Sequence, residues 1–357
     1  MLPPKEAVEQ DIEVLTKLVA TSRALATVNA NIQRLPNPHM LINTIALQEA
    51  KTSTEIENIF TTNDELYKAV SDKKQLEASN PSIKEVIRYR EALWAGYQEI
   101  QQSGTINIDS IIKIFQQVKD SSAGIRPPQA QVVIRRGESE FRSGEIIYTP
   151  PRKAGLIEDL LNNLVEYLND DEKYKIDPLL KMCIAHYQFE AIHPFQDGNG
   201  RTGRILNLLF LVHKGLLTQP ILYLSRYIIV HKDDYYYKLG AVTQLSKWKS
   251  WVMFMLEAVE RTSNLTNRLI NEILQQMEAT LIHGKQHIKW YNKEVNEIIF
   301  SQPYIKPNVL GALLSKTSRT TLTKYMNELV QARILSTKKD GLEVYYLNDD
   351  LLRILEQ

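Results

Sequence analysis

The sequence contains only one cysteine, Cys183, among its 357 residues. A single cysteine excludes an intramolecular disulfide framework and is compatible with a reducing cellular compartment. Cys183 lies between Met182 and Ile184 in an apolar pattern. We therefore expect a buried structural thiol, with a nucleophilic cysteine as the alternative.

An excess of charge and a long apolar run are also absent. The chain has 43 Lys and Arg against 42 Asp and Glu, which gives no general attraction to nucleic acid or membranes. The apolar run Ile205–Val212 is too short to span a bilayer, which takes about 20 residues. Residues 1–6 lack the basic and apolar regions of a signal peptide. We expect a soluble, cytoplasmic protein without membrane contact.

Apolar residues recur at helical spacing along most of the chain, without an internal repeat or a low-complexity segment. This pattern predicts helices over residues 8–35, 40–60, 83–100, 107–118, 156–168 and 178–192. Glycines and prolines bound two β-like runs, Val132–Ile134 and Ile146–Tyr148, which predict a hairpin. The predicted architecture is mostly α, with domains at residues 1–80, 81–265 and 285–357.

The segment His193–Arg204 reads H-P-F-Q-D-G-N-G-R-T-G-R and directly precedes the apolar run Ile205–Val212. That run predicts a buried helix, so the polar segment lies where a loop enters a helix. Backbone N–H groups at a helix start have no partner within the helix, and the helix dipole adds positive charge there. Gly198 and Gly200 let this backbone approach an anion closely.

Two arginines strengthen the prediction of an anion site. Arg201 and Arg204 are three residues apart and share a helix face, from which they can bind two different phosphate groups. Taken singly, each feature has an ordinary interpretation: a Gly-Asn-Gly turn, a solvated arginine pair, or a turn histidine before Pro194. Their joint occurrence favours a polyphosphate site with His193 at its edge.

The segment resembles the Fic family signature H-P-F-x-[D/E]-G-N-G-R-x-x-R at every specified position. Flanking segments also resemble the family: residues 185–192, 222–225, 235–237 and 248–251. The resemblance implies a Fic-type helical core with a β-hairpin flap, and an enzyme that transfers AMP from ATP to a hydroxyl side chain of a target protein. The acceptor would be a serine, threonine or tyrosine, and self-modification is included.

The resemblance also implies roles for the motif residues. An attacking hydroxyl must lose a proton, and His193 is the side chain suited to accept it near neutral pH. Asp197 is the expected Mg²⁺ ligand, with a turn-capping aspartate as the alternative. The amide of Asn199 is expected to donate to a phosphate oxygen. Phe195 is expected in the core.

Further ligand contacts follow from the same resemblance. Arg201 is expected at the β-phosphate and Arg204 at the γ-phosphate. Tyr235 and Tyr236 match the position that contacts adenosine, although tyrosines at this spacing are also ordinary core residues. The flap is expected to receive the target segment by strand addition, with Ile134 in the best-matching run. Arg135 departs from the glycine usual there, and a plain edge hairpin is the alternative.

A second signature lies upstream of the motif. Ser53, Glu57 and Asn58 occupy the defining positions of the Fic inhibitory motif [S/T]-x-x-x-E-[G/N]. The spacing places Ser53 and Glu57 on one helical face, from which the carboxylate could pair bidentately with Arg204 and exclude the γ-phosphate. The alternative is a capping box, in which Glu57 bonds back to Thr54 at a helix start.

The C-terminal residues 285–357 predict a winged-helix-like α+β module. Helical patterns at 294–300, 308–314 and 318–334 precede a strand at Glu343–Leu347, and Ser318 is expected to cap the third helix. The small excess of basic residues favours a protein-contact or regulatory role over DNA binding. One alternative for the whole chain is a DNA-binding regulator with a nucleotide-sensing or AMP-removing Fic core. The target protein and the oligomeric state are not predicted.

Overall fold

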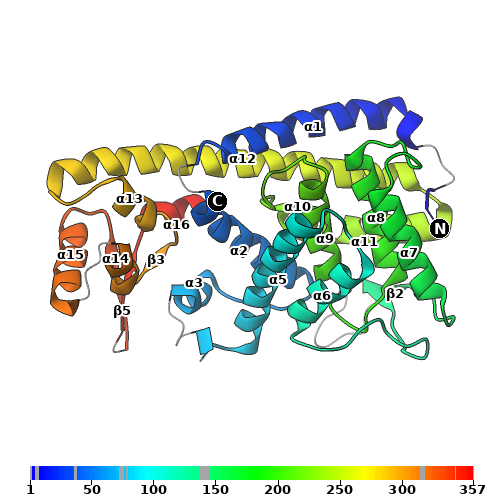
Figure 1. Cartoon of the computed structure of the whole chain (residues 1–357), viewed down its shortest axis with the longest axis horizontal. Coiled ribbons are helices and arrows are strands. Elements are labelled where there is room, and N and C mark those ends of the chain that lie inside the picture. Colours follow the sequence, from blue (N-terminus) through cyan, green and yellow to red (C-terminus); the bar gives the residue numbers. More distant parts are fainter. Residues whose placement is uncertain are drawn as a thin grey trace. The chain divides into compact units, whose positions relative to one another are not determined.

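The computed structural model describes residues 2–4, 8–35, 38–71, 76–77, 79–136, 145–313, 318–341 and 343–356. Over these residues the chain is mostly helical and has two small antiparallel sheets (Figure 1). None of the helices found there is long and apolar enough to cross a membrane. The predicted mostly α architecture is confirmed.

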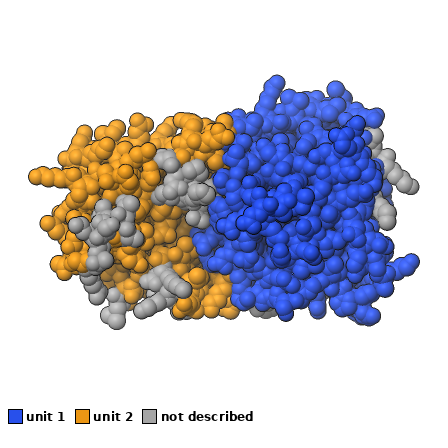
Figure 2. Space-filling model, in the orientation of Figure 1, with its two compact units in different colours: residues 1–29, 46–60, 85–264 blue, residues 30–45, 61–84, 265–357 orange. Residues whose placement is uncertain are grey.

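The chain forms two compact units, which Figure 2 shows in blue and orange. The first contains residues 1–29, 46–60 and 85–264, and the second contains residues 30–45, 61–84 and 265–357. Each unit therefore combines segments that are distant in sequence. The predicted domains 1–80, 81–265 and 285–357 run consecutively along the chain and remain a prediction.

The N-terminal half is helical up to the flap. Its elements are the 3₁₀ helix η1 (Val8–Gln10) and the helices α1 (Ile12–Ile32), α2 (Pro38–Ile56), α3 (Asn63–Ser71), α5 (Pro81–Ser103) and α6 (Ile108–Lys119). The predicted helices correspond to α1, α2, α5 and α6, whereas the short α3 was missed. Asn107 begins α6 with a capping box, because its side chain accepts from the Ser110 backbone and the Ser110 side chain accepts in return.

The flap is a two-stranded antiparallel sheet of β1 (Ile134–Arg136) and β2 (Glu145–Tyr148), in which Ile134 pairs with Tyr148. The predicted first strand therefore begins two residues too early, since Val132 and Val133 precede β1. Gly137 and Gly144, two of the glycines that bound the predicted strands, lie outside the described residues.

The helices after the flap build the core of the first unit. They are α7 (Leu156–Asn169), α8 (Pro178–Ile192), α9 (Asn199–His213), α10 (Leu224–Val230), α11 (Lys232–Leu245) and α12 (Trp248–His287), of which residues 248–264 belong to this unit. Helix α8 packs against α7 and α9, and Figure 1 shows these three in green. Helix α8 begins with Pro178, and the side chain of Asp177 caps it by accepting a hydrogen bond from the Leu179 backbone N–H.

Buried side chains fix α8 and α9 in place. Phe189 on α8 and Phe210 on α9 are at most 1% exposed, and Trp251 on α12 donates its indole N–H to the Cys183 carbonyl at 2.7 Å. Burial raises the pKa of the Cys183 thiol far above neutrality, so the thiol stays protonated. The structural role expected for Cys183 fits this environment.

The C-terminal elements lie in the second unit. They are α13 (Lys293–Ile299), β3 (Tyr304–Ile305), α14 (Pro307–Leu313), α15 (Arg319–Gln331), β4 (Ser336–Asp340), β5 (Glu343–Leu347) and α16 (Asp349–Leu355). The sheet has the order β3-β5-β4, and all its pairs are antiparallel. The three predicted helices and the strand are present. Ser318 occupies the predicted N-cap position of α15, but the expected capping hydrogen bond of its side chain is not formed.

Candidate active site

The motif forms the turn between α8 and α9. Helix α8 ends at Ile192, and His193 follows in the left-handed region with φ of +49°. Gly198, with φ of +79°, directly precedes Asn199, the first residue of α9. A positive φ costs glycine little, so Gly198 permits the tight entry into the helix. The predicted position of the motif, at a helix start, is confirmed.

The side chain of Asn199 holds this turn together. Its oxygen accepts from the Phe195 N–H and its amide donates to the Phe195 carbonyl, both at 2.8 Å. Phe195 is fully buried, as predicted, and stacks on Phe115 of α6 with ring centroids 3.9 Å apart. Because the amide of Asn199 already has a partner, its side chain clamps the loop. A phosphate contact by the Asn199 amide remains a prediction.

The hydrogen bond of His193 defines which ring nitrogen can accept a proton. Nδ1 lies 3.2 Å from the carbonyl oxygen of Glu190. A carbonyl only accepts, so the neutral ring carries its proton on Nδ1 and leaves the Nε2 lone pair available. Burial lowers the pKa of His193 to about 4, which keeps the ring neutral at physiological pH.

The predicted site residues meet at one cavity of about 530 Å³. Its lining includes most of the residues predicted from the sequence: Glu57, Ile134, His193, Asp197, Gly198, Asn199, Gly200, Arg201, Arg204, Tyr235 and Tyr236. The cavity also contains Asn58 of the upstream signature, and it contains residues to which the sequence analysis assigned no role: Glu85, Lys119, Glu190 and Lys232. A cavity of this volume is within the range of small-molecule sites.

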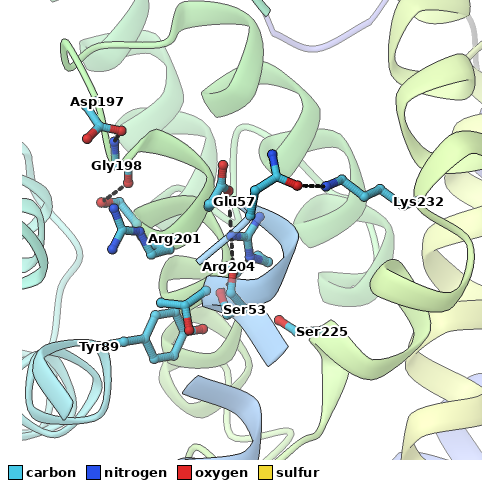
Figure 3. A network of polar contacts seen from close by, with 12 residues as sticks. Ser53, Glu57, Tyr89, Asp197, Gly198, Arg201, Arg204, Ser225 and Lys232 are labelled. Atoms are coloured by element: carbon cyan, nitrogen blue, oxygen red, sulfur yellow. Dashed lines mark hydrogen bonds and ion pairs between the residues drawn. The ribbon is translucent and has the colours of Figure 1, made fainter. Parts of the chain in front are cut away.

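Arg204 binds the end of α2. Its Nη2 donates to Glu57 Oε1 at 2.7 Å and to the Ser53 carbonyl at 2.9 Å, while Nε donates to Ser53 Oγ at 2.7 Å (Figure 3). The predicted pairing with Glu57 is present, but through one guanidinium nitrogen. The bidentate geometry is not formed because Ser53 occupies Nε.

The position of Glu57 excludes the capping box. Helix α2 ends at Ile56, so Thr54 and Glu57 lie at its C-terminal end, where a capping box at a helix start cannot form. Asn58 takes φ of +62°, a common conformation just past a helix end. Burial favours the neutral acid, but the Arg204 guanidinium outweighs it and lowers the pKa of Glu57. Glu57 therefore stays ionised on Arg204.

Gly200 explains how closely the two charged groups approach the loop. A Cβ atom there would lie 2.3 Å from Glu57 Oε1 and 2.9 Å from Arg204 Nη1. These distances leave no room for a methyl group, so glycine is required for the contact of Glu57 with Arg204 at this surface. The same open backbone is available to another anion when Glu57 is elsewhere.

Arg201 and Asp197 also have partners within the cavity. Arg201 is almost fully buried and forms an ion pair with Glu85 of α5. Asp197 Oδ2 accepts from Lys119 Nζ at 2.6 Å, and its other oxygen accepts from the Gly198 N–H at 2.6 Å. Burial raises the pKa of Asp197, but Lys119 outweighs this effect and lowers it overall. Asp197 is 68% exposed and accessible to ligands.

Two further titratable groups, Lys232 and Glu190, line the same cavity as Glu57 and Asn58. Lys232 at the start of α11 donates to Asn58 Oδ1 at 3.2 Å (Figure 3), and burial lowers its pKa. Burial raises the pKa of Glu190 to about 8, although Arg204 acts against this shift. The sequence analysis assigned no role to Lys232 or Glu190, and the spatial arrangement identifies both as cavity residues.

The two predicted adenosine contacts differ in burial. Tyr235 is 2% exposed, and its hydroxyl lies 3.0 Å from His186 Nε2. Burial lowers the pKa of His186 to about 3, so this ring is neutral. The ring of Tyr236 meets that of Tyr235 edge-on with centroids 5.3 Å apart. Both tyrosines line the cavity, and Tyr235 is also a core residue.

Three family models match successive parts of the chain. They are the Fic/DOC family N-terminal model at residues 15–98, the Fic/DOC family model at 105–211, and the model of the C-terminal domain of SoFic-like protein adenylyltransferases at 274–351. Together they cover α1 to α9 and most of the C-terminal elements.

Individual relatives agree with these models. A Caenorhabditis elegans protein adenylyltransferase, fic-1, is 27% identical over 197 residues, which are 54% of this chain and 34% of that protein. A probable protein adenylyltransferase of Aquifex aeolicus is 26% identical and covers 82% of both chains. The chain spans about a third of the length of the first two curated relatives it matches.

Solved structures show the same fold. A Fic family protein from Desulfovibrio desulfuricans superposes with a TM-score of 0.59 at 20% identity, over 97% of this chain and 98% of that one. A Fic-1 structure from C. elegans superposes with a TM-score of 0.52 at 21% identity, over 71% of this chain and 73% of that one.

Proposed function

The chain belongs to the Fic/DOC family, and from this premise we propose that it is a protein adenylyltransferase that transfers AMP from ATP to a hydroxyl side chain of a target protein. One observation carries the proposal. His193, Asp197 and the two arginines of the motif line a single cavity at the start of α9. The cavity therefore contains a base for the hydroxyl proton, a carboxylate for a metal ion, and cations at a helix start that can bind phosphates.

The chemistry assigns the base to His193. The target hydroxyl oxygen attacks the α-phosphorus of ATP and forms the new P–O bond, while the bond to the bridging oxygen breaks and pyrophosphate leaves. The hydroxyl proton passes to Nε2 of His193, since Nδ1 already donates to the Glu190 carbonyl. A positioned base of this kind contributes on the order of 10²–10⁴ in rate.

Cations of the cavity bind the triphosphate in this proposal. Arg201 contacts the β-phosphate and Arg204 the γ-phosphate, while the backbone N–H groups near Gly200 bind phosphate oxygens. Tyr235 and Tyr236 contact the adenosine, and the flap around Ile134 presents the target segment. Support comes from their shared position in the cavity lining.

Mg²⁺ is proposed as the cofactor, with Asp197 as its protein ligand. Asp197 is an exposed carboxylate in the cavity, and Mg²⁺ at nucleotide sites commonly takes one or two carboxylates together with phosphate oxygens and water. Bound there, the ion would neutralise charge on the phosphates. Lys119 must leave Asp197 for this, which an exposed ion pair allows at a cost of about 1 kcal/mol or less.

Glu57 is proposed to restrain the enzyme. Its carboxylate occupies Arg204, the guanidinium assigned to the γ-phosphate, and the triphosphate cannot bind productively while that contact persists. The carboxylate comes from the end of α2, where a small displacement releases it. ATP bound beside Glu57 would then be held in an unreactive arrangement.

Labelling with ATP that carries a labelled α-phosphate tests the proposal. The Glu57→Gly protein is incubated with this ATP, Mg²⁺ and a cell lysate, and labelled proteins are identified by mass spectrometry. We expect AMP on hydroxyl side chains, on the protein itself or on targets. The matched double variant with His193→Ala should label them more slowly by about 10²-fold or more. Undiminished labelling in the double variant contradicts the assigned chemistry.

A further inference from the structure

Arg126 joins three separate backbone segments although it lies outside the motif. It is 3% exposed and precedes the flap. Its Nε donates to the His193 carbonyl at 2.7 Å, and its Nη2 donates to the Pro151 carbonyl at 2.7 Å and to the Ile192 carbonyl at 3.3 Å. Its own backbone N–H donates to the Pro194 carbonyl at 2.8 Å. One residue thus makes four hydrogen bonds to backbone carbonyls.

Two of these carbonyls belong to the end of α8. The last carbonyls of a helix have no partner within the helix, and the helix dipole makes that end negative. The guanidinium of Arg126 satisfies the carbonyls of Ile192 and His193 and offsets this charge. It also holds His193 in its left-handed conformation, which is strained for a residue other than glycine.

The remaining side-chain bond reaches the flap. Pro151 lies three residues after Tyr148, the last residue of β2, and Tyr148 pairs with Ile134 of β1. The same guanidinium therefore connects the base of the flap with the turn that carries His193. Both connections are charge-assisted hydrogen bonds, which are stronger than neutral ones, and Arg126 itself is only 3% exposed.

We propose that Arg126 is a positioning residue that sets the distance between the flap and the imidazole of His193. This inference rests on the proposed transfer reaction, in which the flap presents the hydroxyl and His193 accepts its proton. Without Arg126, the flap and His193 are both still present, but the distance between the hydroxyl and the imidazole is no longer fixed. A displacement of about 1 Å at a reacting centre can cost 10²-fold in rate.

Binding of ATP does not depend on this connection. The phosphate cradle has supports of its own, because Asn199 clamps the loop through Phe195 and Glu85 holds Arg201. A positioning role therefore predicts a loss of kcat with little change in ATP affinity. A merely structural role predicts that stability, ATP affinity and kcat change together.

The test compares variants in the Glu57→Gly background. Arg126→Met removes every side-chain donor, whereas Arg126→Lys keeps the charge and a donor for one carbonyl. We expect kcat of AMP transfer to fall about 10²-fold in the methionine variant, with partial recovery in the lysine variant. The Kd for ATP should stay within about twofold of the parent value.

Lys181→Met provides the matched control. Lys181 is a fully buried cation on α8, the helix whose last carbonyls Arg126 binds. It pairs with Asp171 at 2.6 Å and is absent from the cavity lining. Its loss should lower Tm as much as the loss of Arg126 and leave kcat unchanged at a temperature where the protein is folded. An Arg126→Met protein that keeps the kcat of the parent overturns the inference, as does a parallel loss of ATP affinity.

A second readout separates this inference from the proposed function. Diethyl pyrocarbonate modifies neutral imidazole, and peptide mass spectrometry follows its reaction at His193 alone. We expect Arg126→Met to raise the rate at His193 several-fold and Lys181→Met to leave it unchanged. A parent protein that transfers no AMP refutes the proposed function only. An unchanged modification rate in Arg126→Met overturns the positioning role whether or not AMP is transferred.

Discussion

Replacement of Glu57 by glycine removes the carboxylate that ion-pairs with Arg204 and leaves the Ser53 contacts of that guanidinium in place. The change frees one N–H of Nη2 toward the cavity, while Nη2 still donates to the Ser53 carbonyl. It also removes the group that lies closest to Gly200, so that the start of α9 opens to an anion. We predict that AMP transfer rises.

The magnitude follows from the single contact that is lost. A hydrogen bond between charged groups contributes about 1.5–3 kcal/mol, and Glu57 remains 32% exposed, which favours the lower half of this range. Since 1.4 kcal/mol corresponds to a tenfold change in an equilibrium constant, we expect roughly 10- to 40-fold faster self-labelling with α-labelled ATP.

Glu55→Gly is the control for the backbone effect of a new glycine near the end of α2. Glu55 pairs with Lys51 at 2.7 Å and is absent from the cavity lining, so its loss should leave labelling unchanged. The double variant Glu57→Gly and Arg204→Ala should lose the gain. A Glu57→Gly protein that folds, binds ATP and labels no faster than the unmodified protein would falsify autoinhibition.

Three further predictions concern the same cavity. In the Glu57→Gly background, His193→Ala should lower AMP transfer by 10²–10⁴-fold and leave the calorimetric Kd for ATP nearly unchanged; undiminished transfer removes His193 from the mechanism. Asp197→Ala should weaken Mg²⁺-dependent ATP binding and transfer together, and EDTA should have the same effect; full activity in chelator refutes the Asp197 assignment. The folded pKa of His193 is about 4, below the usual value near 6.5, so the unfolded state binds more protons between these values and stability is lost as pH falls from about 6.5 to 4. Tm should fall less steeply over this range in His193→Ala, and an equal slope contradicts the assigned pKa.

Residues that lie close together in sequence were the ones that sequence analysis placed correctly. The segment His193–Arg204 forms one turn and the first helical turns of α9, so its spacing alone fixes its geometry. Glu57 was also found from local spacing. The sequence does not decide whether Glu57 lies at the start or past the end of a helix. Asn58, a residue that favours the left-handed region, is typical of a helix end.

The partners of these residues come from distant elements and have no local pattern. Glu85, Lys119 and Arg126 precede the motif by many residues, and each looks like an ordinary charged residue of a helix or loop. Only the packing of α5 and α6 beside α9 brings the first two to the cavity. Burial is the signal that distinguishes Arg126, and burial of one arginine cannot be predicted from its neighbours.

The most direct test of AMP transfer uses two forms of labelled ATP with the Glu57→Gly protein and Mg²⁺. One form carries its label on the α-phosphate and the other on the γ-phosphate, and protein-bound label and released pyrophosphate are measured. We predict label on protein from the α-labelled form only, with one pyrophosphate released for each AMP bound. Label on protein from the γ-labelled form, or ATP binding without any protein-bound label, would contradict the proposed adenylyltransferase.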